Sequence, residues 1–245
     1  MTSKLPATEL FLSVIARLGL VRSEAYARAQ LQDLFAGVDL QNKRVLDIGG
    51  GSGIYSFYAA CAGAREVVCL EPEASGSKAG ATLLFGKISA ELPGANVRLD
   101  RRTVEEYTTD GFFDVILMHF SLNHLDENAC IELCRNREAW ESYKNRFAHI
   151  GSLLRPGGKI IVSDCARHNF FALLGAKNPL CPTIEWRKHQ QPEVWARLLE
   201  ETGFRRPAIR WEPLYRFGFL GRVLLGNKVA AYFLKGIFRL EVEKG

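Results

Sequence analysis

The chain has 245 residues, of which 47% are hydrophobic and 24% are charged, and its formal net charge is +5 at pH 7. This length and composition predict one α/β domain with a large core. No run of uncharged apolar residues is long enough to cross a membrane. The first residues also lack the charged-then-apolar pattern of a signal peptide. A membrane-spanning protein and a secreted one are therefore both disfavoured.

The cysteine pattern argues against disulfides and against a metal centre. Six cysteines are scattered without a C-x-x-C pair or the spacing of a zinc site: Cys61, Cys69, Cys130, Cys134, Cys165 and Cys181. We expect buried, reduced thiols, a cytoplasmic protein and no bound metal ion.

Taken in chain order, the first predicted elements are two helices. Apolar residues recur at helical spacing over residues 8–36, and the pattern is interrupted near Gly19. The sequence therefore predicts an N-terminal helical extension in front of the first strand.

A glycine-dense turn follows the first predicted strand. The strand covers residues 44–48, a helix is predicted over residues 54–62, and Asp47 stands just before the turn. The turn between them contains Gly49, Gly50, Gly51 and Gly53. Strand, glycine turn and helix form the ligand-binding corner of a doubly wound α/β sheet. Glycine suits such a turn because the backbone is strained and a ligand approaches it closely.

The spacing of these glycines discriminates between nucleotide-binding motifs. Ile54 replaces the third glycine of a dinucleotide fingerprint, and no Gly-Lys-Ser/Thr tripeptide occurs for a phosphate-binding loop. The pattern Asp-x-Gly-x-Gly-x-Gly over residues 47–53 resembles motif I of the class I S-adenosylmethionine (SAM)-dependent methyltransferases.

An acidic residue ends the second predicted strand, which covers residues 67–70. Glu71 lies about 20 residues beyond the glycine turn, where a carboxylate suits ribose hydroxyls. The resemblance implies that Glu71 holds the ribose of SAM, with Pro72 beside it. After a third predicted strand over residues 96–99, the resemblance implies adenine contacts from Thr103 and Val104, although the family often has Asp near Thr103.

The fourth predicted strand, residues 113–118, is followed by His119 and Phe120. Methyltransferases of nucleic-acid and protein amino groups often carry an Asn/Asp-Pro-Pro-Tyr-like tetrapeptide here, and this chain does not. The departure favours the small-molecule branch, in which an ending such as His124-Leu125 is common. The resemblance also implies that His119 and Phe120 contact the cofactor.

A second family signature, L-x-P-G-G, occupies residues 154–158 and precedes an apolar strand over residues 159–163. Before it, residues 126–153 form a long helical stretch with a break. We expect Pro156 to stop this helix and the two glycines to turn the chain into the sheet. The resemblance covers roughly residues 40–211 and a final strand.

The last predicted elements complete the expected fold. Pro192 starts a helix that ends at Gly203, and strands follow over residues 208–211 and 237–242. The resemblance implies a Rossmann-like doubly wound sheet, mostly parallel with an antiparallel last strand and helices on both faces. We expect a single domain over residues 1–245. Its expected parts are a helical cap (1–38), a SAM-binding core (39–211) and lid insertions (165–191 and 213–235).

Both insertions leave from the carboxyl ends of strands, where ligands of α/β sheets bind. Their aromatic and aliphatic content indicates a small, largely apolar or aromatic acceptor. In this family an N-terminal extension commonly packs over the cofactor, so Tyr26 joins the candidates. The candidate substrate contacts are Tyr26, His124, Phe170 and Trp186.

Methylation of a hydroxyl group or an activated carbon requires a proton acceptor, and histidine suits that role near neutral pH. His119 and His189 are the candidate bases, with Glu185 as the orienting carboxylate or an alternative base. The predicted activity is methyl transfer from SAM to a small-molecule acceptor at oxygen, with carbon as the alternative and no metal.

Charge is unevenly distributed along the chain. Residues 205–245 hold nine Lys/Arg and three Glu, so this segment carries +6 and the remainder −1. The interpretations left open are an ordinary solvated surface, peripheral membrane contact with a lipid-like acceptor, and a nucleic-acid or protein methyltransferase. Nucleic acid is not the expected partner. A non-catalytic SAM-binding module is a further alternative, and the protein is expected to be a monomer or a homodimer.

Overall fold

The computed structural model describes residues 6–72 and 80–245, and it divides into two compact units. The N-terminal unit comprises Met1–Thr108 and Phe113–Leu117, and the C-terminal unit comprises Thr109–Phe112 and Met118–Gly245. In the described part of the chain, seven strands are hydrogen-bonded in the order β3-β2-β1-β4-β5-β7-β6. This order, with β1 between β2 and β4, is that of a doubly wound sheet and confirms the predicted fold class.

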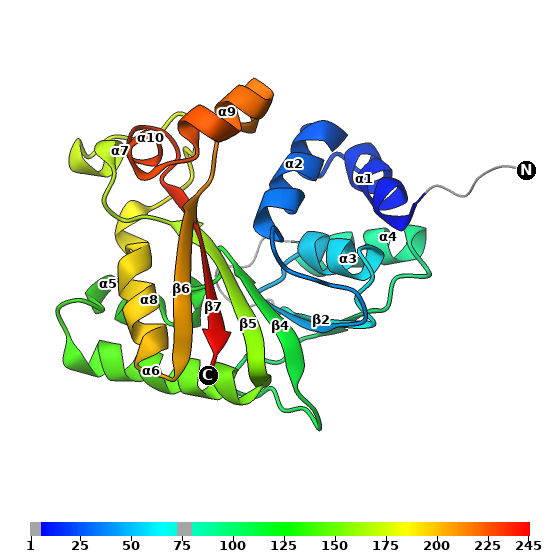
Figure 1. Ribbon diagram of the computed structural model, residues 1–245, viewed down its shortest axis with the longest axis horizontal. Helices are drawn as coiled ribbons and strands as arrows, with labels where there is room; N and C mark the ends of the chain where they lie inside the picture. The colour runs from blue at the N-terminus through cyan, green and yellow to red at the C-terminus, as the bar shows by residue number, and fades with distance from the viewer. Residues whose placement is uncertain (1–5, 73–79) are drawn as a thin grey trace, which may run out of the picture. The chain divides into compact units, whose positions relative to one another are not determined.

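The N-terminal unit contains the two predicted helices and the first strands. Its elements are α1 (Ala7–Arg17), α2 (Glu24–Leu34), β1 (Arg44–Ile48), α3 (Ile54–Cys61), β2 (Glu66–Leu70), α4 (Ala81–Glu91), β3 (Val97–Asp100) and most of β4 (Phe113–His119). Figure 1 shows α1 and α2 as separate helices. Gly19 lies between them with φ +69°, a conformation that glycine adopts without steric cost.

Two parallel strands of this unit, β1 and β2, are buried on both faces. β1 pairs with β2, and β2 pairs with β3, both in parallel. In β1 and β2 every residue after the first is buried. Continuous apolar runs of this kind are typical of parallel strands covered on both sides, which explains why short unbroken runs predicted them well.

The C-terminal unit contains the remaining elements. They are η1 (Asn123–Leu125), α5 (Glu127–Glu132), α6 (Arg137–Ser152), β5 (Leu154–Cys165), α7 (Phe170–Leu173), η2 (Trp186–Lys188), α8 (Pro192–Glu200), β6 (Phe204–Trp211), η3 (Tyr215–Phe217), α9 (Gly218–Leu225), α10 (Lys228–Phe233) and β7 (Ile237–Lys244). The predicted break in the helical stretch falls between α5 and α6, and Pro192 occupies the first turn of α8.

The last strand runs against its neighbours, as predicted. β7 lies between β5 and β6 and is antiparallel to both, and Figure 1 shows the three strands side by side. Behind them, α6 and α8 share an aromatic core in which the Tyr143 and Trp195 rings lie 5.2 Å apart. Burial of these rings holds α8 against the strands.

The turn predicted at the L-x-P-G-G signature is wrong in detail. α6 ends at Ser152, and β5 already begins at Leu154, so Pro156 lies inside a strand and does not terminate the helix. Pairing of β5 with β7 begins only at Lys159. Pro156 precedes the β7 ladder, so its missing N–H costs no hydrogen bond to β7.

The cysteines of the described residues are free thiols, and their burial is mixed. Cys69, Cys130 and Cys165 are buried, as predicted, whereas Cys134 is exposed and the other two are half-buried. Burial raises the pKa of Cys130 to about 12, which keeps this thiol protonated and unreactive. Among the described residues, no helix is both long and apolar enough to span a bilayer.

Candidate active site

The glycine turn of the N-terminal unit has the backbone geometry of a ligand-binding loop. Gly49, Gly51 and Gly53 all have positive φ, and Gly53 is the N-cap residue that precedes α3. A Cβ on Gly50 would lie 2.5 Å from the Cys69 sulfur. A Cβ on Gly51 would meet no atom of the described residues within 4 Å. The loop is therefore packed on one side and open at Gly51.

Asp47 is buried directly beneath this loop. Its Oδ2 accepts a 2.6 Å hydrogen bond from the Ser56 hydroxyl, and its Oδ1 is buried without a partner among the described residues. Burial raises the pKa of Asp47 to about 7, and the nearby Glu71 carboxylate adds to the rise. An unsatisfied buried oxygen at this position is a feature that a bound ligand can complete.

The loop is fastened to the end of β2. The Gly49 N–H donates to the Leu70 carbonyl, and the Gly51 N–H donates to Glu71 Oε2, both at 2.8 Å. Glu71 itself is buried. Glu71, the acid predicted to follow β2, thus lies beside the glycine turn and helps to hold its shape. The sequence spacing had indicated only a ribose contact for this residue.

We expect the Ser56→Ala substitution to destabilise the protein by about 1–3 kcal/mol, because a buried carboxyl group loses its hydroxyl donor. Urea unfolding would measure the change. Ser152→Ala is the matched control, since this exposed hydroxyl donates only to the His149 carbonyl of its own helix. An equal loss in both variants would contradict the role given to Ser56.

Asp47 also predicts a pH dependence of stability. Its folded pKa of about 7 lies above the ordinary value of 3.8, so the folded state holds a proton that the unfolded state has released between these pH values. Stability conferred by that proton is present at acid pH and is lost as pH rises towards 7, with a slope approaching about 1.4 kcal/mol per pH unit. Chemical unfolding from pH 4 to 8 would measure the free energy of unfolding of the protein and of Asp47→Asn. The difference between the two is expected to change with pH at this slope. A difference independent of pH would contradict it.

The candidate adenine contacts lie after β3. Thr103 and Glu106 form a reciprocal pair: the Thr103 N–H donates to the Glu106 carboxylate, and the Glu106 N–H donates to the Thr103 hydroxyl. Val104 is buried. Asp100 ends β3, and hydrogen bonds from Arg102 keep its pKa well below the usual range. Adenine contacts from Thr103 and Val104 remain predictions.

In the C-terminal unit, His119 is the last residue of β4 and Phe120 follows it with φ +51°. The Phe120 N–H donates to the Ser163 carbonyl at 2.8 Å. The centroids of the His119 and Phe120 rings lie 4.5 Å apart, and the rings meet edge to face. Positive φ is uncommon outside glycine and marks a constrained position. The backbone therefore fixes the direction in which the chain leaves this strand.

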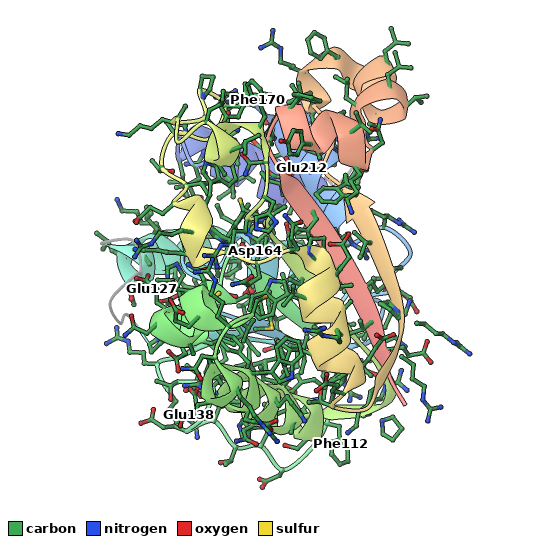
Figure 2. All side chains as sticks on the ribbon, turned by 90° about the vertical axis from the view of Figure 1, so that its left-hand side faces the viewer. Phe112, Glu127, Glu138, Asp164, Phe170 and Glu212 are labelled. Atoms are coloured by element: carbon green, nitrogen blue, oxygen red, sulfur yellow. The ribbon has the colours of Figure 1, made fainter. Side chains whose placement is uncertain are left out.

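The most distinctive polar pair of this unit joins β5 to the segment before α8. His189 Nδ1 and Asp164 Oδ1 lie 2.8 Å apart, and both side chains are buried. Asp164 is the penultimate residue of β5, and Figure 2 shows it in the interior of the unit. Its Oδ1 also accepts the Cys165 N–H at 2.7 Å, whereas its Oδ2 has no partner among the described residues.

Glu185 does not orient His189. It lies 3.0 Å from Lys188 in a largely exposed ion pair, and Asp164 takes the position beside the imidazole. Sequence reasoning missed Asp164 because adjacency to His189 in the chain pointed to Glu185. The available signal was an acidic residue at the end of an otherwise apolar strand.

The candidate substrate residues lie in different surroundings. Tyr26 is half-buried in the first turn of α2, and its N–H donates to the capping Ser23 hydroxyl. His124 is exposed in η1, whereas Trp186 is buried with Cys165 and Ile237. The Phe170 ring lies 5.5 Å from the Phe233 ring, so α7 packs against α10. Substrate contact by these four residues remains a prediction.

A doubly wound sheet with a glycine turn after β1 and a buried acid after β2 defines a class of proteins that bind a nucleoside-containing cofactor. Residues 21–206 match the sequence profile of the methyltransferase domain family. The chain belongs to the class I SAM-dependent methyltransferases, and its cofactor is SAM.

Curated relatives resemble the chain to different extents. The ubiquinone biosynthesis O-methyltransferase of Marinobacter nauticus is 28% identical over 201 residues, covering 76% of this chain and 74% of the relative. The histone-arginine methyltransferase CARMER of Drosophila erecta is 51% identical over 51 residues, and this match covers 21% of the chain. The matched part amounts to only 9% of the length of that relative.

Solved structures share the fold. A SAM-dependent methyltransferase from Listeria monocytogenes aligns with a TM-score of 0.58 at 13% identity, covering 89% of this chain and 98% of the other. Magnesium protoporphyrin IX methyltransferase from Synechocystis, with bound S-adenosylhomocysteine (SAH), aligns with a TM-score of 0.54 at 16% identity, covering 90% and 82%.

The residues of the N-terminal unit fit SAM. The open face at Gly51 leaves room for a ligand to approach the backbone, and Asp47 Oδ1 is a buried acceptor without a partner among the described residues. Glu71 places carboxylate charge beside the same turn.

Proposed function

We propose that this protein transfers a methyl group from SAM to a hydroxyl oxygen of a small, largely apolar or aromatic molecule, with His189 as the proton acceptor. The observation that carries the proposal is the buried hydrogen bond between His189 Nδ1 and Asp164. The two side chains come from separate segments, and their pairing costs the burial of a carboxylate. Such pairs are typical of catalytic bases.

The pairing supports a defined role for each residue. A carboxylate next to Nδ1 favours the tautomer in which Nδ1 carries the hydrogen, so Nε2 keeps its lone pair. Asp164 also stabilises the imidazolium that forms when Nε2 takes a proton. Asp164 stands at the carboxyl end of β5, and ligands of doubly wound sheets bind beyond such ends.

SAM supplies an electrophilic methyl group on a sulfonium. Bound SAM would give this methyl group to the acceptor oxygen and leave as SAH, and His189 Nε2 would take the hydroxyl proton. The residues of the chain therefore align the acceptor and remove one proton, and alignment accounts for much of the acceleration in such displacements.

The cofactor contacts we propose follow the family motif. They are Asp47, Gly49, Gly50, Gly51, Gly53, Glu71, Pro72, Thr103, Val104, His119 and Phe120. We further propose that residues 1–38 form a cap, residues 39–211 the SAM-binding core, and the insertions over residues 165–191 and 213–235 the lids of one methyltransferase domain. The O-methyltransferase relative of Marinobacter nauticus supports oxygen as the target atom.

A nucleic-acid substrate is the less supported alternative. Several cations of the basic C-terminal segment are ion-paired within the fold, including Lys235 with Glu212, Arg239 with Glu241, and Arg206 with Glu243. Paired cations contribute little to binding a phosphate backbone, which depends on cations that can displace its counterions.

Two methyl acceptors of the same shape test whether the enzyme methylates oxygen. Catechol and 1,2-diaminobenzene have the same shape but offer oxygen or nitrogen to the methyl group. We expect transfer from SAM to a catechol oxygen, detected by mass spectrometry of the products, and little transfer to the diamine. Methylation of the diamine alone, or of neither compound while SAM binds, would contradict O-methylation of an aromatic acceptor.

A further inference from the structure

Large apolar side chains are exposed together on four short helices of the C-terminal unit. Each is at least 50% exposed, and they come from α7 with its C-cap residue, η3, α9 and α10: Leu173, Leu174, Phe217, Leu220, Val223, Leu224, Val229 and Phe233. We call these eight residues the apolar patch. They make up most of the large hydrophobic residues exposed in the described part of the chain.

The helices that carry the patch lie together. Figure 1 shows α7, α9 and α10 gathered at one end of the C-terminal unit, and the Phe170–Phe233 ring contact joins α7 to α10. On α9, Leu220, Val223 and Leu224 follow the spacing of one helix face. Contiguous exposed apolar surfaces mark interaction sites, whereas isolated exposed leucines do not.

The two segments that carry the patch are basic. Residues 165–184 and 213–235 contain no Asp or Glu. The Lys and Arg residues of these two segments are Arg167, Lys177, Arg216, Arg222, Lys228 and Lys235. Lys177, Arg216, Arg222 and Lys228 are exposed, although Lys228 also pairs with Glu193. These segments therefore combine apolar side chains with basic ones, of which Lys228 and Lys235 pair with acidic residues outside the segments.

We propose that the apolar patch docks on the surface of an anionic lipid bilayer. Interfacial helices bury Leu and Phe side chains among acyl chains while their Lys and Arg side chains reach the head groups. Each Lys or Arg near an anionic membrane surface adds electrostatic attraction to the docking. Exposed cations such as Lys177 and Arg216 give this patch a preference for anionic over neutral lipid.

Charge argues against a second copy of the chain as the occupant. Two patches placed face to face would bring the cations of both copies together, with no acidic residue in either segment to pair with them. Like charges in a contact that excludes water are unfavourable. An anionic bilayer supplies both the apolar interior and the opposite charge.

Docking of this kind would place the protein where lipid-soluble acceptors dissolve. That consequence rests on the proposed function, whereas the docking itself does not. The test therefore measures binding to vesicles without any methyl acceptor, so that a failure of the proposed chemistry and a failure of docking are separate results.

Sedimentation of the full chain with phosphatidylcholine vesicles, with and without phosphatidylglycerol, tests the proposal. We expect binding to the anionic vesicles, weaker binding to the neutral ones, and at least about a tenfold loss of binding in the Leu220→Glu/Leu224→Glu variant. Leu83→Glu on α4 is the matched control, because Leu83 is 66% exposed and Leu220 is 65% exposed. Val229→Glu tests the same patch from α10 if the double variant fails to fold.

Two results would overturn docking. One is the absence of binding to anionic vesicles, including the case in which light scattering shows a dimer that the patch variants dissolve. The other is vesicle binding that survives in folded patch variants or falls equally in Leu83→Glu. Thermal unfolding and SAH binding identify which variants are folded.

Discussion

Replacing Asp164 by Asn is expected to lower kcat for methylation of a phenolic acceptor by about 10²- to 10⁴-fold, the range for loss of general-base assistance. The amide removes the negative charge beside His189 Nδ1, at present 2.8 Å from the carboxylate. It can also present an N–H to the ring and so favour the wrong tautomer. Steady-state kinetics with radiolabelled SAM would measure the loss.

Variants of His189 and Glu185 test whether His189 is the catalytic base. His189→Gln is expected to match Asp164→Asn, and the double variant is expected to lose little more, because residues that act as a unit are not additive. Glu185→Gln serves as the control, since Glu185 pairs with Lys188 on the surface. Full activity in His189→Gln, or a large loss in Glu185→Gln, would reassign the base.

Replacing Glu71 by Ala is expected to weaken SAM binding by about 10- to 100-fold, the factor that corresponds to a charged hydrogen bond. The Gly51 N–H loses the carboxylate oxygen that accepts it at 2.8 Å, so the glycine turn is no longer held to the end of β2. Titration calorimetry with SAM or SAH would measure the dissociation constant.

Glu66→Ala is the matched control for this experiment. Glu66 lies at the other end of β2, where it pairs with Arg44 at 2.7 Å. Its loss is expected to leave the affinity for SAM unchanged, and a partly exposed ion pair contributes at most about 1 kcal/mol to stability. Equal weakening in both variants would show a general effect on the fold and would contradict a role of Glu71 at the loop.

Local pattern was sufficient for the elements around the glycine turn. β1 covers the residues predicted for it, and the helix after the turn ends one residue earlier than predicted, at Cys61. Steric requirements are local here, because the positive φ values of Gly49, Gly51 and Gly53 depend on the turn itself. The acid after β2 was also predictable, since strand length and turn length fix its distance from the turn.

The local sequence pattern did not predict where β5 and β6 begin. β5 begins at Leu154, although Pro156 and two glycines indicated a turn. β6 likewise begins at Phe204, well before the predicted start, with an irregular register between Arg205 and Ala208. Hydrogen-bond partners in neighbouring strands decide such limits, and these partners are distant in sequence.

The sequence by itself determined the family, the cofactor and the loop that resembles motif I, because glycine geometry and strand–turn–helix spacing are properties of a short segment. Only the tertiary structure decided that His189 pairs with Asp164, 25 residues away, and that Glu185 does not. It also decided which acidic residues pair with the C-terminal cations, as Glu212 does with Lys235. Both outcomes depend on packing between segments that no local pattern encodes.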